Sequence, residues 1–288
     1  MKKIIFSMAA ALMLMSVFTS CSNDDNDGGI QFNEQTYNAW SKVVFTYGSM
    51  FDANETLKVS QTQVSFHSDT WGDGSFTVSE FKQNEDGSFN VVGTGTLTMA
   101  GHGGKKDYDA TVSGIIAKGA QSFTITVPSV MGGTVLNVSA GEIPVAAAVD
   151  GSYTGGTYAN SKYFQHYQPT KDEKVSIKAN DDLSAAALSY TSATWGEFSF
   201  ENIVVAKSED GSYTIIGDGK TLMPSMKGGT TEYAATLEGT LTGKTLVATF
   251  AVPGVMGGTT IYFNAADFDE VYEAANADKE EGEAESGK

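Results

Sequence analysis

The chain carries few residues whose types and spacing are typical of catalysis. Its histidines, His67, His102 and His166, form neither an HxH nor an HExxH pattern, so the sequence predicts no metal site. Its single cysteine, Cys21, follows an apolar run near the N-terminus and cannot form an internal disulfide. There is no Gly-x-Ser-x-Gly segment for a nucleophilic serine. We therefore expect no cofactor and no nucleophilic chemistry.

Carboxylates are the remaining candidates for catalysis, because 35 acids could hide the paired carboxyl groups of a glycosidase. Asp107, Asp109 and Glu80 fall in strand-like runs, where any two could meet. Their counterparts in the second sequence copy described below keep an acid only at Glu232. A carboxylate-dyad glycosidase thus stays a remote alternative, and the chain is predicted not to be an enzyme.

Aromatic residues are better candidates, and their chemistry would be recognition. Trp71 and Trp195 each precede a glycine, and an exposed Trp on a rigid strand could stack on a sugar ring. The interpretation we favour for these two is a core plug that closes one end of a barrel. The other candidates for a ligand or interaction surface, which core packing could also explain, are Trp40, Tyr163, Phe164 and Tyr167.

Composition limits the class of protein. Hydrophobic residues make up 41% of 288, enough to bury a core, so a wholly disordered chain is excluded. The formal net charge is -17 and all 18 basic residues are lysines. Such a chain repels phosphate backbones and lacks the guanidinium groups that recognise phosphates and bases in a bidentate way. We therefore expect no nucleic acid as a partner.

The elements that must position these residues occur twice. The segment Ser68–Gly72 matches Ser192–Gly196, 124 residues later, and Glu85–Phe89 matches Glu209–Tyr213 at the same offset. A third match joins Val127–Thr134 to Val252–Thr259, 125 residues later. This period is too long for a solenoid. We predict two homologous domains, residues 30–146 and 150–266.

Each copy is predicted to consist of short strands. Phe123–Val127 alternates strictly between apolar and polar residues, which indicates one buried and one wet face. Asp86-Gly87 suits a type I′ hairpin or a longer turn with a left-handed Gly. Seven or eight strands per copy favour an antiparallel barrel or sandwich. Short helices are expected at residues 32–44 and 267–277.

One motif defines the end of each copy. Val-Pro-x-Val-Met-Gly-Gly should place Pro128 and Pro253 at strand ends, and its glycine pair should adopt positive φ in a turn before the last strand. The methionine of this turn is expected to cap the adjacent core.

The N-terminus has the features of an export signal. Lysines at positions 2 and 3 precede the mostly apolar residues 4–18, a run that is short for a membrane span. With Cys21 following Thr19-Ser20, residues 1–20 resemble a bacterial lipoprotein signal peptide. The resemblance implies cleavage before Cys21 and its acylation, including a palmitate-type chain, although Phe18 replaces the usual Leu. An ordinary signal with an incidental cysteine is the alternative.

The residues after Cys21 resemble the acidic export tag of surface lipoproteins from Bacteroidetes, which implies a surface-export signal in a tether of residues 21–29. The tag residues are Ser22, Asn23, Asp24, Asp25 and Asp27. A plain solvated tether on the periplasmic leaflet is the alternative. Removing residues 1–20 takes away two lysines and leaves 16 against 35 acids, a net charge of -19. Residues 267–288 are expected to form an acidic tail.

Together, the lipoprotein signal, the tandem copies, the Tyr-x-Ala-Thr strand and the Val-Pro-x-Val-Met-Gly-Gly-Thr turn resemble the calycin-like β-barrel lipoproteins of Bacteroides. The resemblance covers most of residues 45–265. It implies an all-β fold of two tandem antiparallel calycin-like β-barrels, and it carries no catalytic residue over.

These observations predict a lipid-anchored protein of the outer membrane that faces outside. Membrane contact would be made through the N-terminal lipid. The favoured function is a non-enzymatic binding or interaction module with an envelope protein as partner. The alternative is a lipocalin-like carrier of a small apolar or glycan ligand. Large inward Phe, Ile and Met residues favour filled interiors, and so favour the interaction module.

Overall fold

The computed structural model describes residues 32–101, 104–165, 167–224 and 228–265. The proposed signal peptide, Cys21, the export tag, the acidic tail and the helix expected at 267–277 lie outside these ranges. In the part of the chain that the structure describes, no helix is both long and apolar enough to span a membrane.

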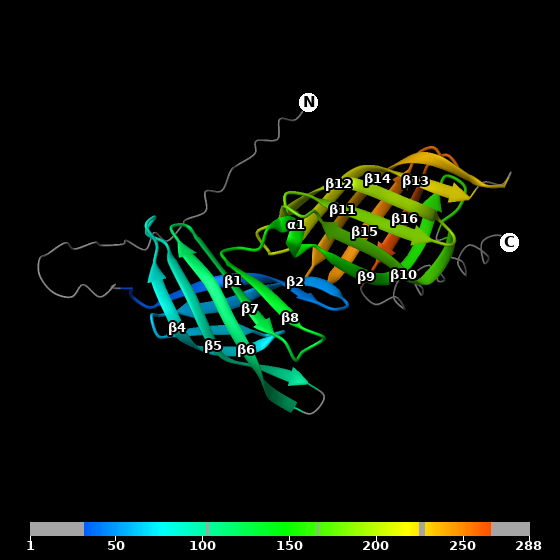
Figure 1. The fold of residues 1–288 in the computed structure, drawn as a ribbon. Helices are drawn as coiled ribbons and strands as arrows, with labels where there is room; N and C mark the ends of the chain where they lie inside the picture. The colour runs from blue at the N-terminus through cyan, green and yellow to red at the C-terminus, as the bar shows by residue number, and fades with distance from the viewer. Residues whose placement is uncertain (1–31, 102–103, 166, 225–227, 266–288) are drawn as a thin grey trace, which may run out of the picture. The chain divides into compact units, whose positions relative to one another are not determined.

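The first copy forms a closed antiparallel barrel in which each strand pairs with the next and β8 pairs with β1 (Figure 1). Its eight strands are β1 Gln35–Phe45, β2 Gly48–Val59, β3 Gln63–Ser68, β4 Gly72–Gln83, β5 Phe89–Gly101, β6 Gly104–Ala117, β7 Ala120–Val127 and β8 Thr134–Ala140. Closure leaves no strand edge free to template aggregation. We call this sheet barrel 1.

The second copy, barrel 2, repeats this topology, and β16 pairs with β9 to close it. Its strands are β9 Gly151–Ser161, β10 Tyr167–Ala179, β11 Ala186–Ser192, β12 Gly196–Lys207, β13 Tyr213–Pro224, β14 Thr230–Thr242, β15 Thr245–Val252 and β16 Thr259–Asn264. A single turn of helix, α1 Val145–Ala148, follows Pro144 and precedes β9. The predicted pair of all-β barrels is confirmed, with eight strands in each.

Alternation of side chains puts large residues inside both barrels. In β7, Phe123, Ile125 and Val127 are buried, while the residues between them are partly exposed. In barrel 2 the Tyr190 ring stacks on Phe198 and Phe250, with centroids 5.4 and 5.1 Å apart. Such rings bury a large apolar area and fill an eight-stranded barrel from within.

The helix expected at residues 32–44 is wrong, because Gln35–Phe45 is strand β1. Its inward positions in mid-strand are Ala39, Ser41 and Val43, of which Ala39 is small, Ser41 is small and polar, and only Val43 is a typical core residue. Their weak hydrophobic contrast hides the period of two in the sequence. Pairing with both β2 and β8 supplies the strand's backbone partners.

The turns follow the glycine pattern. Gly87 has φ +82° in a loop in which the Asn84 amide donates to the Ser88 carbonyl over 2.8 Å, which is the longer of the two expected turns. In the β15–β16 turn Gly257 and Gly258 have φ +73° and +103°, as predicted. The expectation that the methionine caps the core is wrong, since Met131 and Met256 are 50% and 44% exposed.

Candidate functional site

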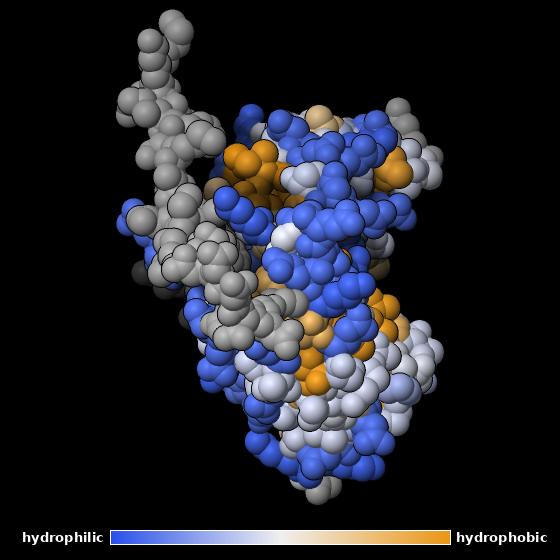
Figure 2. Space-filling model, turned by 60° about the vertical axis from the view of Figure 1, so that its left-hand side comes forward, coloured by the Kyte–Doolittle hydropathy of each residue, from blue (hydrophilic) through white to orange (hydrophobic). Residues whose placement is uncertain are grey.

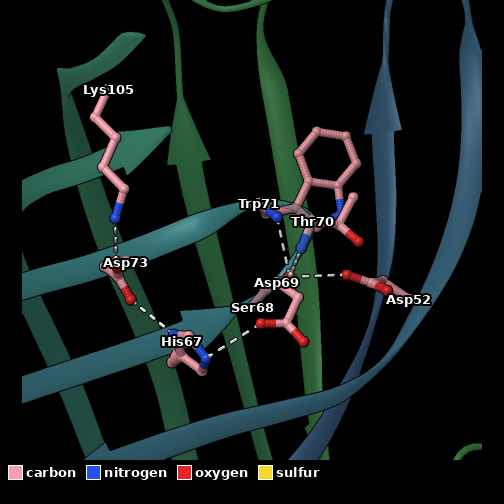
Figure 3. Close-up of polar contacts among 8 residues, drawn as sticks. All are labelled: Asp52, His67, Ser68, Asp69, Thr70, Trp71, Asp73 and Lys105. Atoms are coloured by element: carbon pink, nitrogen blue, oxygen red, sulfur yellow. Dashed lines mark hydrogen bonds and ion pairs between the residues drawn. The ribbon is translucent and has the colours of Figure 1, made fainter. Parts of the chain in front are cut away.

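A hydrogen-bonded turn holds Trp71 at one end of barrel 1. Between β3 and β4, the Ser68 Oγ accepts the backbone N–H groups of Thr70 and Trp71 at 3.1 and 3.0 Å. The same hydroxyl donates to Oδ2 of Asp52 on β2 over 2.8 Å (Figure 3). Two strands and the turn are thereby fastened together around the Trp71 indole.

Barrel 2 repeats this arrangement with a different acid. The Ser192 Oγ accepts the N–H groups of Thr194 and Trp195 at 3.2 and 3.3 Å and donates to Oε1 of Glu173 over 2.9 Å. Both tryptophans are buried, so little of either ring is accessible to a sugar. The indole N–H groups of Trp71 and Trp195 have no hydrogen-bond partner among the described residues.

A buried acid, Glu55, lies on β2 in phase with Leu57 and Val59, two and four residues further along the strand. Glu55 is 1% exposed, and its Oε1 accepts a 2.7 Å hydrogen bond from the Ser41 hydroxyl of β1. Oε2 has no hydrogen-bond partner among the described residues. Burial raises the pKa of the Glu55 carboxyl to about 8, and the neighbouring Asp52 charge adds to the rise, against the hydrogen bond from Ser41.

Barrel 2 has an acid at the position that corresponds to Glu55. Glu55 pairs with Ala39 across β1 and β2, and Glu173 pairs with Gly155 at the corresponding place across β9 and β10. Sequence reasoning missed both acids because charged residues were assigned to the surface. The available signal was their phase, since Glu55 falls on the same inward-facing positions of β2 as Leu57 and Val59.

In barrel 2, three of the aromatic residues singled out from the sequence come together. The Phe164 and Tyr167 rings lie 4.3 Å apart, and Tyr167 meets the Trp195 ring edge-on at 6.4 Å. These contacts place Tyr167 over the plug of barrel 2. Tyr163 does not join them; it is 71% exposed, with the Lys162 ammonium 5.7 Å from its ring centroid.

Trp40 lies apart from these clusters. It packs against Phe51 at 6.2 Å, where the Lys42 ammonium also lies 5.6 Å from the Phe51 ring. Trp40 is only half-buried. Its place between the inward residues Ala39 and Ser41 puts it on the outer face of the sheet.

His67, one of the three histidines named from the sequence, lies in an exposed cluster with two aspartates. The His67 Nδ1 lies 2.7 Å from Oδ1 of Asp73, and its Nε2 lies 3.7 Å from Asp69 (Figure 3). The hydrogen bond with His67 lowers the pKa of Asp73. The neighbouring Ser68 hydroxyl is bonded to Asp52. The described contacts therefore do not assemble a serine–histidine pair, and no cluster of three or more metal-ligating side chains occurs among the described residues.

The three acids considered for a glycosidase dyad all lie on exposed positions. Asp107 accepts a 2.6 Å hydrogen bond from Thr98, and Asp109 follows on the same face of β6. Glu80 lines an open hollow of about 420 Å³ on the outside of barrel 1, together with Val92 and Ile115. The described contacts bring none of these acids into a buried pair.

Three comparisons with known proteins bear on this architecture. Residues 149–265 match the family model of the calycin-like β-barrel domain. A crystal structure of a "putative outer membrane protein" from Bacteroides fragilis superposes with a TM-score of 0.60 at 20% identity, covering 80% of this chain and 96% of that one. At this identity the likeness concerns the fold. No curated protein matches the chain.

The family match covers barrel 2, and barrel 1 carries the same eight-strand order and the same turn motifs. The resemblance noted from the sequence is thus confirmed: barrel 2 of this chain is a calycin-like β-barrel domain.

Proposed function

We propose that the chain is a lipid-anchored, non-enzymatic interaction module of the outer membrane, exposed on the cell surface. The main observation behind this proposal is that both barrel interiors are filled by side chains, which leaves the outer surface and the turns for binding a partner. Phe76 and Phe123 in barrel 1, and Tyr190, Phe198 and Phe250 in barrel 2, are almost fully buried. A barrel filled by its own side chains binds through its outer surface and turns.

The location is supported by two independent observations. One is the lipoprotein-like signal that ends at Cys21. The other is the fold shared with a Bacteroides fragilis protein that carries an outer-membrane name. A diacylglyceryl group and a third chain on Cys21 would anchor the protein stably, since each buried methylene contributes about 0.8 kcal/mol.

The anchor is tested by Cys21→Ala. The variant should appear as soluble protein, and the wild type should stay with the membrane after a carbonate wash. Membrane-bound Cys21→Ala protein would refute the anchor.

Surface display is tested by replacing Asp24, Asp25 and Asp27 with Ala. Lipidation should persist, and protease added to whole cells should no longer reach the protein. Equal cleavage of the variant and the wild type would show that these acids do not direct export.

A second candidate function is a lipocalin-like carrier of a small ligand. The observation that favours it is the buried, unpartnered indole N–H in each barrel, because buried donors in native proteins are nearly always paired. A carried ligand with an acceptor oxygen would pair with Trp71 or Trp195. Retention of a small molecule by the purified protein distinguishes this function from the first.

A further inference from the structure

The same end of each barrel displays an exposed tyrosine. Tyr47, between β1 and β2, is 86% exposed, and Tyr163, between β9 and β10, is 71% exposed. The two are equivalent in the repeat, since each comes two residues after the last residue of the first strand of its barrel. A single exposed tyrosine could be accidental, but an exposed tyrosine at the same position of both barrels indicates that the side chain has a function.

An exposed methionine lies beside each tyrosine. Met131 and Met256, in the β7–β8 and β15–β16 turns, have φ +47° and +49°. Left-handed backbone is unfavourable for a methionine, and strain of this kind is retained where the structure has a use for it. Both copies keep the strained residue and expose its thioether side chain.

The described contacts show that the two turns adjoin. In barrel 1 the Thr46 N–H donates to the Met131 carbonyl over 3.3 Å, next to Tyr47. In barrel 2 a methyl group added at Gly257 would lie 3.6 Å from Tyr163 Cε2. We call residues 46–47 with 128–133 the tip of barrel 1, and residues 162–165 with 253–258 the tip of barrel 2.

The tips also differ in charge from the rest of the chain. Neither contains an acid, although the chain has 35, and the tip of barrel 2 adds Lys162. The described surface in Figure 2 is mostly hydrophilic with separate hydrophobic patches. Tyrosine and lysine at the rim of an apolar tip are the residues that lie at the headgroup level of a bilayer.

The proposed N-terminal tether is long enough to let a barrel tip reach the bilayer in which Cys21 would be anchored. β1 begins at Gln35 and runs its full length before it meets the tip at Tyr47. Eleven residues of strand span about 36 Å. Phe32 is buried and Glu34 pairs with Lys58, so the free tether ends before Phe32. The 11 residues from Cys21 to Phe32 can extend to about 36 Å, which equals the full length of the strand, so the tether is long enough to let the tip of barrel 1 face the anchoring bilayer.

We propose that the two tips are membrane-contact sites, at which Tyr47 with Met131 and Tyr163 with Met256 enter the interface of the lipid bilayer that anchors the chain. This inference rests on the proposed function for the anchor. A single tip buries little area, so its contact depends on the high local concentration that the tether provides. Lipid contact at the tips would hold the barrels against the membrane instead of leaving them free on the tether.

The test supplies the anchor chemically, so it does not depend on lipidation in the cell. The chain from residue 21 onward is coupled through Cys21, its only thiol, to a maleimide lipid in phosphatidylcholine vesicles. Tyr47→Trp and Tyr163→Trp each add one reporter to the three native tryptophans. Glu85→Trp is the matched control, since the β4–β5 turn lies at the opposite end of barrel 1.

Lipids with brominated acyl chains should quench the added emission of Tyr47→Trp and Tyr163→Trp and should leave that of Glu85→Trp unchanged. Adding Met131→Ser or Met256→Ser to the matching reporter should reduce the quenching. Equal quenching at the tips and at Glu85→Trp would overturn the proposal. Unquenched tips together with a dimer that Met131→Ser dissociates would assign the tips to a second copy instead.

Discussion

Inside barrel 1 the hydroxyl of Ser41 donates a 2.7 Å hydrogen bond to Oε1 of Glu55, and both residues are buried. This pair joins β1 to β2 next to a register shift between Ala39 and Ser41. It leaves Oε2 of Glu55 without a hydrogen-bond partner among the described residues. A barrel interior therefore contains a carboxyl group that is most stable in its protonated form.

Glu55 predicts a pH dependence of stability. Its pKa is about 8 in the folded chain against an ordinary value of 4.5, so the folded state binds the proton more tightly than the unfolded state. The free energy of unfolding should fall as the pH rises between these two values, and level off above the higher one. Urea unfolding at several pH values, followed by tryptophan fluorescence, measures this slope.

Glu55→Gln provides the control for this prediction. Gln retains an oxygen that can accept from Ser41 but cannot ionise, so the variant should lose the slope and exceed the wild type in stability above pH 8. Parallel pH profiles for variant and wild type would show that Glu55 titrates as an ordinary surface acid.

Ser68 and Ser192 should contribute equally to their own barrels. Ser68→Ala removes the acceptor for two turn N–H groups and the donor to Asp52. The loss of such a cap costs about 1–2 kcal/mol. Ser192→Ala should lower the stability of barrel 2 by a similar amount. Chemical denaturation of both variants checks this, and an unchanged midpoint for either would contradict the role of its turn.

Tyr167 is predicted to shield Trp195 from water. Tyr167→Ser removes the ring that meets Trp195 edge-on at 6.4 Å and should shift the Trp195 emission to longer wavelength. Phe45→Ser is the matched change in barrel 1, where Phe45 lies 6.5 Å from Trp71. Emission spectra in Trp40→Phe backgrounds report both. An unchanged spectrum for Tyr167→Ser would mean that other groups cover the indole.

The two barrels are predicted to unfold separately. Gly257→Val forces a branched residue into φ +73°, beside Lys162 and Tyr163. The strain should cost about 1–3 kcal/mol and lower only the transition of barrel 2 in calorimetry. Gly132→Val, at φ +76°, should lower only that of barrel 1. If either variant shifts both transitions together, the halves form one cooperative unit.

The sequence predicts the barrels well because their signals are local and repeated. The alternation through Phe123 and the glycine turns survive in both copies, so the strand order follows from short connections. Strand β1 was not predicted because two of its inward mid-strand residues, Ala39 and Ser41, are small or polar. The burial of Glu55 was not predicted because an acid was assumed to be solvated. The exposure of Met131 was not predicted because an apolar side chain was assumed to be buried. Both depend on tertiary packing that residue type alone does not reveal.

The intact mass of the protein purified from its membrane, measured under native conditions, tests the account most directly. The account predicts a chain that begins at Cys21, carries diacylglycerol and a third acyl chain, and has no other molecule bound. A chain without acyl groups would contradict the anchor. A small molecule that leaves only on activation would contradict the filled barrels and establish the carrier function instead.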